Sequence, residues 1–213
     1  MKKILNAKFF TFLALILTLF NCASNIKSDL KNGDLLFVTA KNSGLSGAIN
    51  NVTQKKESEK FDHIGILEIK NGKYFVLHAS PEKGSNRQDL KDLIKNQKED
   101  KQNIVVYRLK PEFQNAISTA LEKANTMLGK PYNFNYILDE NSYYCSDFIE
   151  RIFRIDNIFK LEPMTFFDPK TGKTNEFWQN FYDKKNLKVP EGEPGCNPNG
   201  LAASEKLMRI IEL

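Results

Sequence analysis

The chain has 213 residues, of which 41% are hydrophobic and 27% are charged. This composition excludes a disordered chain and a disulfide-dense scaffold, and the length suits one globular domain. The formal net charge of +5 falls to +2 when residues 1–21, with their three lysines and no acid, are left out. We therefore expect no nucleic-acid partner.

The first 21 residues have the layout of a secretory signal. Lys2, Lys3 and Lys8 precede the uncharged run Phe9 to Phe20. This run of 12 residues is too short for a transmembrane helix, which needs about 20. We therefore interpret residues 1–21 as a signal peptide and residues 22–32 as a polar tether to the domain at 33–213.

Cys22 ends this leader in the sequence Leu19-Phe20-Asn21-Cys22, which resembles a bacterial lipobox. Phe20 and Asn21 are larger than the residues usual there, so simple cleavage without lipid is the alternative. The pattern predicts lipid attachment at Cys22 and a protein held at a membrane of the cell envelope, on the periplasmic or surface side.

The next segments predict a strand and a short helix. Asp34 to Val38 is an apolar run of strand length, and residues 43–54 place Leu45, Ile49 and Val52 on one helical face. From His63 to Ala79, two β-branched and aromatic runs flank Asn71-Gly72, a strong signal for a β-hairpin.

The second half predicts further elements in order. The lysine-rich stretch up to Gln102 is expected to form a loop with at most one helical turn, and Ile104 to Leu109 a strand. Residues 113–128 have the apolar stripe of a helix, followed by the stop signals Gly129 and Pro131. A second helix is expected to begin near Cys145, residues 190–200 to be irregular, and residues 202–211 to form a terminal helix.

The two histidines of the chain, His63 and His78, both lie in the predicted hairpin. With Asn71 and Gly72 as the turn, Gly65 lies opposite His78, and both histidines face the same side of the sheet as diagonal neighbours. Because Gly65 has no side chain, it leaves room beside His78. The alternative is two unrelated histidines that are satisfied by backbone or water.

Cys145 is predicted at the start of a helix, on the same stripe as Phe148 and Ile149. A helix N-terminus and a nearby imidazolium both favour a thiolate. A cysteine, a base and a group that orients the base form the usual machinery of covalent acyl transfer. Cys196 lies in a Pro/Gly-rich segment and is interpreted as structural or incidental.

These motifs in this order resemble the circularly permuted papain-like amidases of the YiiX-like group. The resemblance rests on Gly33-Asp34, His63-Ile64-Gly65-Ile66 and Tyr144-Cys145-Ser146-Asp147, and it extends over residues 33–210. The histidine precedes the cysteine, whereas NlpC-type cell-wall peptidases place the cysteine first. The order is also similar to that of lecithin retinol acyltransferase relatives.

The resemblance implies an α+β, permuted papain-like fold, with an antiparallel sheet packed against helices and the site between these layers. It implies Cys145 as the nucleophile, His63 as the base and His78 in the third place, where the YiiX-like group often has an acidic residue. Tyr132 and Tyr144 are given no role.

Three function classes stay open at this point. The first is a cysteine hydrolase of an amide or isopeptide bond. The second is a lipid acyl hydrolase or acyltransferase with the same mechanism. The third is a non-catalytic lipoprotein with a Cys145–Cys196 disulfide. The expected partners are a small-molecule, peptide or lipid substrate and the membrane, and no metal or other cofactor is expected.

Overall fold

The computed structural model describes residues 29–41, 44–53 and 59–213. The predicted signal peptide and Cys22 lie outside these residues. The chain divides into two compact units, Met1–Lys31 and Asn32–Leu213, and only residues 29–31 of the first are described. Within the described ranges, no helix is both long enough and apolar enough to cross a membrane.

A six-stranded antiparallel sheet forms the centre of the second unit, in the order β4-β3-β2-β1-β5-β8. Its strands are β1 (Leu35–Thr39), β2 (Phe61–Lys70), β3 (Lys73–Ser80), β4 (Gly84–Asp89), β5 (Ile104–Leu109) and β8 (Leu207–Glu212). Helices pack against this sheet, which confirms the predicted α+β class with an antiparallel sheet.

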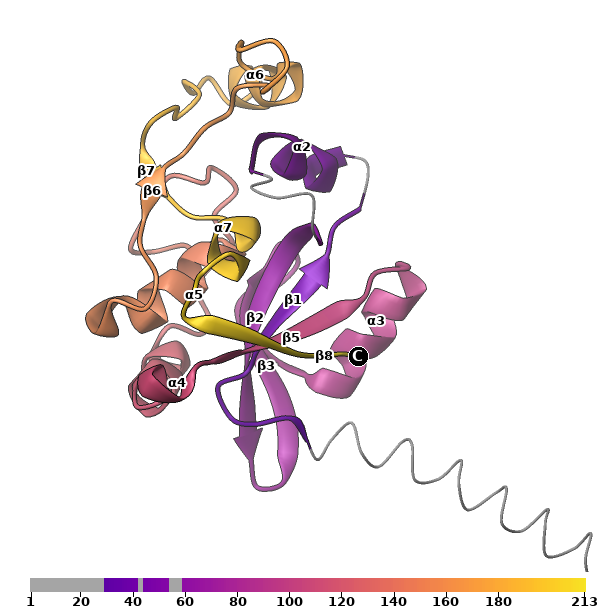
Figure 1. Ribbon diagram of the computed structural model, residues 1–213. Coiled ribbons are helices and arrows are strands. Elements are labelled where there is room, and N and C mark those ends of the chain that lie inside the picture. The colour runs from indigo at the N-terminus through magenta and orange to yellow at the C-terminus, as the bar shows by residue number, and fades with distance from the viewer. Residues whose placement is uncertain (1–28, 42–43, 54–58) are drawn as a thin grey trace, which may run out of the picture. The chain divides into compact units, whose positions relative to one another are not determined.

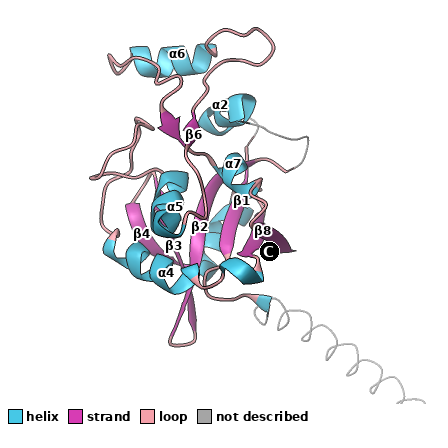
Figure 2. Ribbon diagram, turned by 60° about the vertical axis from the view of Figure 1, so that its left-hand side comes forward, coloured by secondary structure: helices cyan, strands magenta, loops and turns pink. Residues whose placement is uncertain are grey.

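The helices are α2 (Gly44–Thr53), α3 (Leu90–Glu99), α4 (Ala116–Thr126), α5 (Cys145–Phe153), α6 (Glu176–Asp183) and α7 (Pro198–Ala202). Short 3-10 turns occur at Pro111–Phe113 and Arg154–Asp156. The two-residue strands β6 (Glu162–Pro163) and β7 (Pro194–Gly195) pair with each other. Helices α4 and α5 cover one face of the sheet and α3 lies on the other (Figures 1 and 2).

The β2–β3 hairpin forms as predicted. Asn71 and Gly72 have φ angles of 53° and 72°, the left-handed values that a tight two-residue turn requires. Ile66 of β2 pairs with Leu77 of β3, which is the predicted register. That register fixes the faces on which the two histidines lie.

Two of the apolar cores in the described part of the unit lie around the site. The larger joins one face of the sheet to α4 and α5 and includes Ile64, Ile66, Phe148 and Ile149. The smaller joins α2, α6 and the loop before α5, around Trp178, whose indole N–H donates to the Ala48 carbonyl at 3.3 Å. The smaller core holds α6 and its flanking loops in place beside the site.

The prediction of a loop between residues 80 and 102 is wrong, because this segment forms β4 and α3. Strand β4 (GSNRQD) has no apolar alternation, so its pairing with β3 decides its structure. Helix α3 buries only Leu90 and Leu93 and is capped by Asp89, whose side chain accepts from Lys91 N–H at 2.8 Å. A single buried turn gives too weak a periodic signal to stand out among the lysines.

The C-terminal prediction is also wrong in part. Residues 207–212 form β8 rather than a helix, because β5 offers a free edge that this segment pairs with. A short apolar run fits either element, so the tertiary partner decides. Residues 190–200, expected to be irregular, contain β7 and the start of α7, and α6 lies in a stretch for which no element was predicted.

Candidate active site

Cys145 is the first residue of α5, as predicted. Tyr144 precedes it in an extended conformation and its carbonyl accepts from Phe148 N–H at 2.9 Å. The Cys145 side chain is almost fully buried, with 5% of its residue surface exposed. The backbone N–H groups of the first helical turn, which lack partners within the helix, therefore lie beside the thiol.

Two outside segments hold the start of α5. Tyr143 donates its N–H to the Pro131 carbonyl at 3.2 Å and accepts from Asn133 N–H at 3.0 Å. On the other side, the Ser146 hydroxyl donates to the Cys196 carbonyl at 3.1 Å. Cys196 thus holds the residues next to Cys145 through its backbone.

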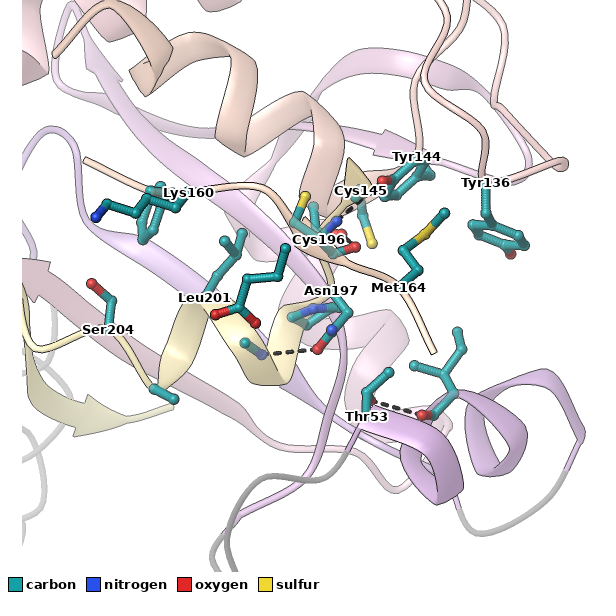
Figure 3. A pocket seen from close by; sticks show the side chains of 18 of the residues that line it. Thr53, Tyr136, Tyr144, Cys145, Lys160, Met164, Cys196, Asn197, Leu201 and Ser204 are labelled. Carbon is teal, nitrogen blue, oxygen red and sulfur yellow. Dashed lines mark hydrogen bonds between the residues drawn. The ribbon is translucent and has the colours of Figure 1, made fainter. Parts of the chain in front are cut away.

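Cys145 and Cys196 are both free cysteines in this structure. They line the same cavity, but their sulfur atoms point to different sides (Figure 3). The Cys145–Cys196 disulfide that the third function class requires is therefore absent between these two described residues.

A buried ion pair braces the first turn of α5. Asp147 is fully buried, and its Oδ1 accepts from Nε of Arg151 at 2.6 Å. Arg151 also donates to Glu140 at 2.6 Å and lies over the ring of Tyr143, with its guanidinium carbon 5.3 Å from the ring centroid. Removing one partner of such a pair leaves a buried charge, so these contacts fix the helix start strongly.

His63 and His78 meet as the hairpin geometry predicts. Nε2 of His63 lies 2.7 Å from Nδ1 of His78, and the two rings are nearly perpendicular, at 76°. His78 is buried, with 2% of its surface exposed. The two imidazoles therefore form one hydrogen-bonded unit.

Gly65 is needed beside this pair. A Cβ atom at this position would lie 2.5 Å from Cγ1 of Val76 and 3.1 Å from Cβ of His78. Real Cβ atoms do not approach other carbons so closely, so a larger residue would push β3 and His78 away. The predicted role of Gly65, to leave room against His78, agrees with these contacts.

A β-bulge lies next to His63. Val38 of β1 pairs with His63, but the next residue, Thr39, pairs with Phe61, so Asp62 is the extra residue on β2. The Asp62 carbonyl oxygen lies 3.9 Å from Sγ of Cys145. Bulges bend a strand and redirect its side chains, and they are common beside active sites. Here the bulge brings the β2 backbone against the thiol.

The thiol and the imidazoles lie on different sides of β2. Ile64 and Ile66 share a core with Cys145, whereas His63 lies on the alternate face together with Gly65. The pairing of β2 with β3 ends at Ile66. On its β3 side Ile64 therefore has no partner strand, although on its β1 side it pairs with Phe37. The thiol lies at this open edge, and among the described residues it makes no hydrogen bond to either histidine.

Burial controls the titration of the site. It raises the pKa of the Cys145 thiol to about 12; the Asp62 carboxylate acts in the same direction, while backbone N–H groups such as that of Ser146 oppose it. Burial also lowers the pKa of His63 to about 3, with repulsion from His78 adding to the effect, and that of His78 to about 4. At neutral pH the site therefore holds a neutral thiol and neutral imidazoles. Desolvation of the buried thiol therefore opposes the thiolate that the helix N-terminus was predicted to favour.

A cavity of about 1000 Å³ opens at the thiol. Figure 3 shows Cys145 in its middle part, with Tyr136, Tyr144 and Met164 to one side and Lys160 and Ser204 to the other. Its lining is mixed. Apolar and aromatic residues that line it include Ile49, Val52, Tyr132, Tyr136, Ile158, Phe159, Met164, Phe166 and Trp178; charged residues that line it include Asp62, Lys110, Glu112, Lys160, Glu205 and Lys206.

The order of motifs, the hydrogen-bonded histidine pair and the helix that begins at a cysteine agree with a comparison against known families. Residues 29–211 match the family model described as permuted papain-like amidase enzyme, YaeF/YiiX, C92 family. The chain belongs to this family. The expected resemblance is thus confirmed, and the permuted papain-like amidases are a family of hydrolases.

A solved member has the same fold. The crystal structure of the protein described as metalloprotein yiiX from Escherichia coli O157:H7 superposes with a TM-score of 0.70. It is 20% identical to this chain, and the match covers 87% of this chain and 98% of that one. At this identity the likeness shows the permuted papain-like fold alone. Among curated proteins, no sequence matches this chain.

Because that structure is described as a metalloprotein, we tested whether the residues here fit a metal. In the part of the chain that is described, no group of three or more His, Cys, Asp or Glu side chains converges as a ligand set. Each of His63 and His78 already uses one ring nitrogen on the other. The residues of this site do not fit a metal, and no step below uses one.

Several site residues were not predicted from the sequence. Asp62 enters through the bulge, which no local pattern signals, and Tyr136 lines the cavity through the fold of the preceding loop. Tyr132 and Tyr144, noted in the sequence without a role, both line the cavity. Asn86 lies directly across from His78 on β4, a strand that the sequence did not reveal.

Proposed function

We propose that this chain is a cysteine-nucleophile hydrolase that cleaves an amide or isopeptide bond through a thioester acyl-enzyme. The observation that carries the proposal is the position of Cys145. Cys145 begins a helix and lines a large cavity. Its sulfur lies against the backbone of Asp62, the residue before His63, and His63 is hydrogen-bonded to His78. Membership of an amidase family supports the reaction class.

In the proposed first step, His63 removes the proton from the Cys145 thiol while the sulfur attacks the substrate carbonyl carbon. Nε2 of His63 is used by His78, so Nδ1 is the nitrogen that takes this proton. Because thiol and imidazole are both neutral at rest, the transfer accompanies the attack and does not precede it. Because the thiol and the His63 side chain lie on different sides of β2, this transfer requires the His63 ring to turn toward the thiol at the open edge of β2 when substrate binds; such contacts are often missing before substrate is bound.

The attack forms a carbon–sulfur bond and places negative charge on the carbonyl oxygen. The backbone N–H of Cys145, at the helix N-terminus, donates to that oxygen in this scheme. The His63 imidazolium then gives its proton to the leaving amine as the carbon–nitrogen bond breaks. Water, deprotonated by His63, hydrolyses the thioester and restores the thiol.

His78 orients His63 in this scheme. Its Nδ1 accepts a hydrogen bond from Nε2–H of His63, and this bond stabilises the His63 imidazolium when it forms. A carboxylate in this place would stabilise the imidazolium more strongly. Burial lowers the pKa of His78, which favours the neutral ring that this role needs.

A lipid acyl hydrolase or acyltransferase is the second candidate. The apolar residues that line the cavity, such as Ile49, Val52 and Met164, favour an acyl chain. The charged residues that line it, such as Lys110, Glu112 and Lys160, favour a polar or peptidic substrate. The mechanism at Cys145 is the same in both cases.

Covalent probes separate the two candidates. The protein would be treated with an acyloxymethyl ketone that carries a dipeptide and with one that carries a palmitoyl chain, and Cys145 labelling would be measured by peptide mass mapping. Faster labelling by the dipeptide probe supports the amidase, and faster labelling by the palmitoyl probe supports the lipid enzyme. Cys145→Ser is the matched control, and equal modification of Cys196 and Cys145 would contradict a specific nucleophile.

We also propose that the chain is exported and anchored by lipid at Cys22, in the cell envelope. The support is the lysine-rich start, the 12-residue apolar run and the Leu19–Cys22 pattern. Intact mass of protein extracted from membranes tests this. A mass equal to an unmodified chain beginning at any residue would contradict lipidation and leave the proposed reaction unaffected.

A further inference from the structure

The outer ring nitrogen of His78 lacks a well-formed hydrogen bond. Nδ1 of His78 faces His63 at 2.7 Å, so Nε2 is its other hydrogen-bonding atom. This Nε2 is buried and has no hydrogen-bond partner of good geometry in the described ranges. Whether this atom carries a proton decides how the histidine pair works.

Asn86 is the residue placed to bind this nitrogen. It lies directly opposite His78 in the β3–β4 pairing, and residues in such pairs project from the same face of a sheet. Its side-chain Nδ2 donates to the Gly84 carbonyl at 2.9 Å and approaches Ser80 Oγ at 3.4 Å. These contacts use the amide nitrogen and leave Oδ1 as an acceptor. Asn86 also acts to raise the pKa of His78.

The chemistry of the pair requires one arrangement of protons. A neutral imidazole has one N–H, so if Nδ1 of His63 accepts the thiol proton, Nε2 of His63 must carry the hydrogen. That N–H donates to Nδ1 of His78, which must then be unprotonated. His78 consequently carries its own hydrogen on Nε2, and this buried N–H needs an acceptor.

We propose that Asn86 is that acceptor and is a positioning residue of the site. Its Oδ1 accepts a hydrogen bond from Nε2–H of His78, which fixes the His78 tautomer and so leaves Nδ1 of His63 free as the base. The inference rests on the proposed function, because it concerns the base of that reaction. Asn86 acts through His78 and His63 and does not contact the substrate.

Other polar groups near His78 must be compared with Asn86 as acceptors for its Nε2–H. Glu82 and Gln88 also act to raise its pKa and Lys83 acts to lower it. Gln88 is the rival acceptor, since it lies two residues along β4, opposite Val76 and on the same face as Asn86. Gln88→Leu is therefore the matched control for Asn86→Leu.

Nitrogen-15 NMR of the full-length protein in detergent micelles reads the tautomers directly. The chain has two histidines, so both sets of ring signals can be assigned from His78→Gln alone. In the wild type we expect the Nε2–H form for both rings. Asn86→Leu should lose the single His78 form, Asn86→Asp should keep it and raise the pH at which the pair titrates, and Gln88→Leu should change neither tautomer.

Reaction of Cys145 with the dipeptide acyloxymethyl ketone gives a second readout. Asn86→Leu should slow labelling by at least about tenfold, because a wrong tautomer removes the base, and Asn86→Asp should restore most of it. Trp178 fluorescence checks that each variant is folded.

An Nδ1–H form of His78 in the wild type, or tautomers that change in Gln88→Leu and not in Asn86→Leu, would overturn the proposal. The NMR result does not depend on turnover. Unchanged hydrolysis in Cys145→Ser would instead overturn the proposed function, so the two failures are distinguishable.

Discussion

Acidification should destabilise this protein through its two buried histidines. Their pKa values are lowered from 6.5 to about 3 for His63 and about 4 for His78, mainly by burial. The unfolded chain therefore binds more protons than the folded chain between pH 6.5 and about 4. Stability is fully present above pH 6.5 and is lost as the pH falls through this window.

The magnitude follows from the proton count. Each histidine that is protonated only on unfolding costs about 1.4 kcal/mol per pH unit, so the pair contributes a slope of about 2.7 kcal/mol per pH unit. Asp147 acts in the opposite direction, because burial raises its pKa from 3.8 to about 6 and the folded state takes up its proton first. The wild type should therefore lose less between pH 6 and 4.5 than the histidines alone would give.

A difference between two proteins isolates the histidine contribution. Urea titrations between pH 4.5 and 7.5, followed by fluorescence of the single Trp178, would be run on the wild type and on the double variant His63→Gln with His78→Gln. Trp178 is 2% exposed, so its emission should report unfolding. Because Asp147 is present in both proteins, the difference in slope should approach about 2.7 kcal/mol per pH unit. Equal slopes would refute the reasoning.

Three substitutions test the site itself. Gly65→Ala should destabilise the protein by about 1–3 kcal/mol, because the new Cβ would lie 2.5 Å from Val76 Cγ1, and adding Val76→Ala should recover part of this loss in urea titrations. Cys145→Ala and His63→Ala should each abolish hydrolysis of a dipeptide amide substrate, and the double variant should lose little more, since the two groups act in one step; additive losses would contradict a shared step. His78→Gln should retain part of the rate, because an amide can still accept from His63, and its free energy of unfolding should be measured alongside to separate packing from chemistry.

The sequence determined the parts of the fold that local chemistry specifies. Asn71-Gly72 demands a tight turn, the turn sets the register, and the register places His63 and His78 on one face, with Gly65 across from His78. The order of these motifs before Cys145 also indicated the family and the start of α5. These inferences hold because each depends on residues close together in the chain.

Tertiary structure alone decided the remainder. Whether residues 207–212 form a helix or a strand depends on the free edge of β5, and β4 is a strand because β3 pairs with it. The bulge at Asp62 depends on the pairing of β2 with β1, and the Cys145 thiol that approaches it lies 83 positions further along the chain. The environment of the thiol was decided there too, because a helix N-terminus favours a thiolate locally, while burial by distant segments removes most of the water that would stabilise the charge.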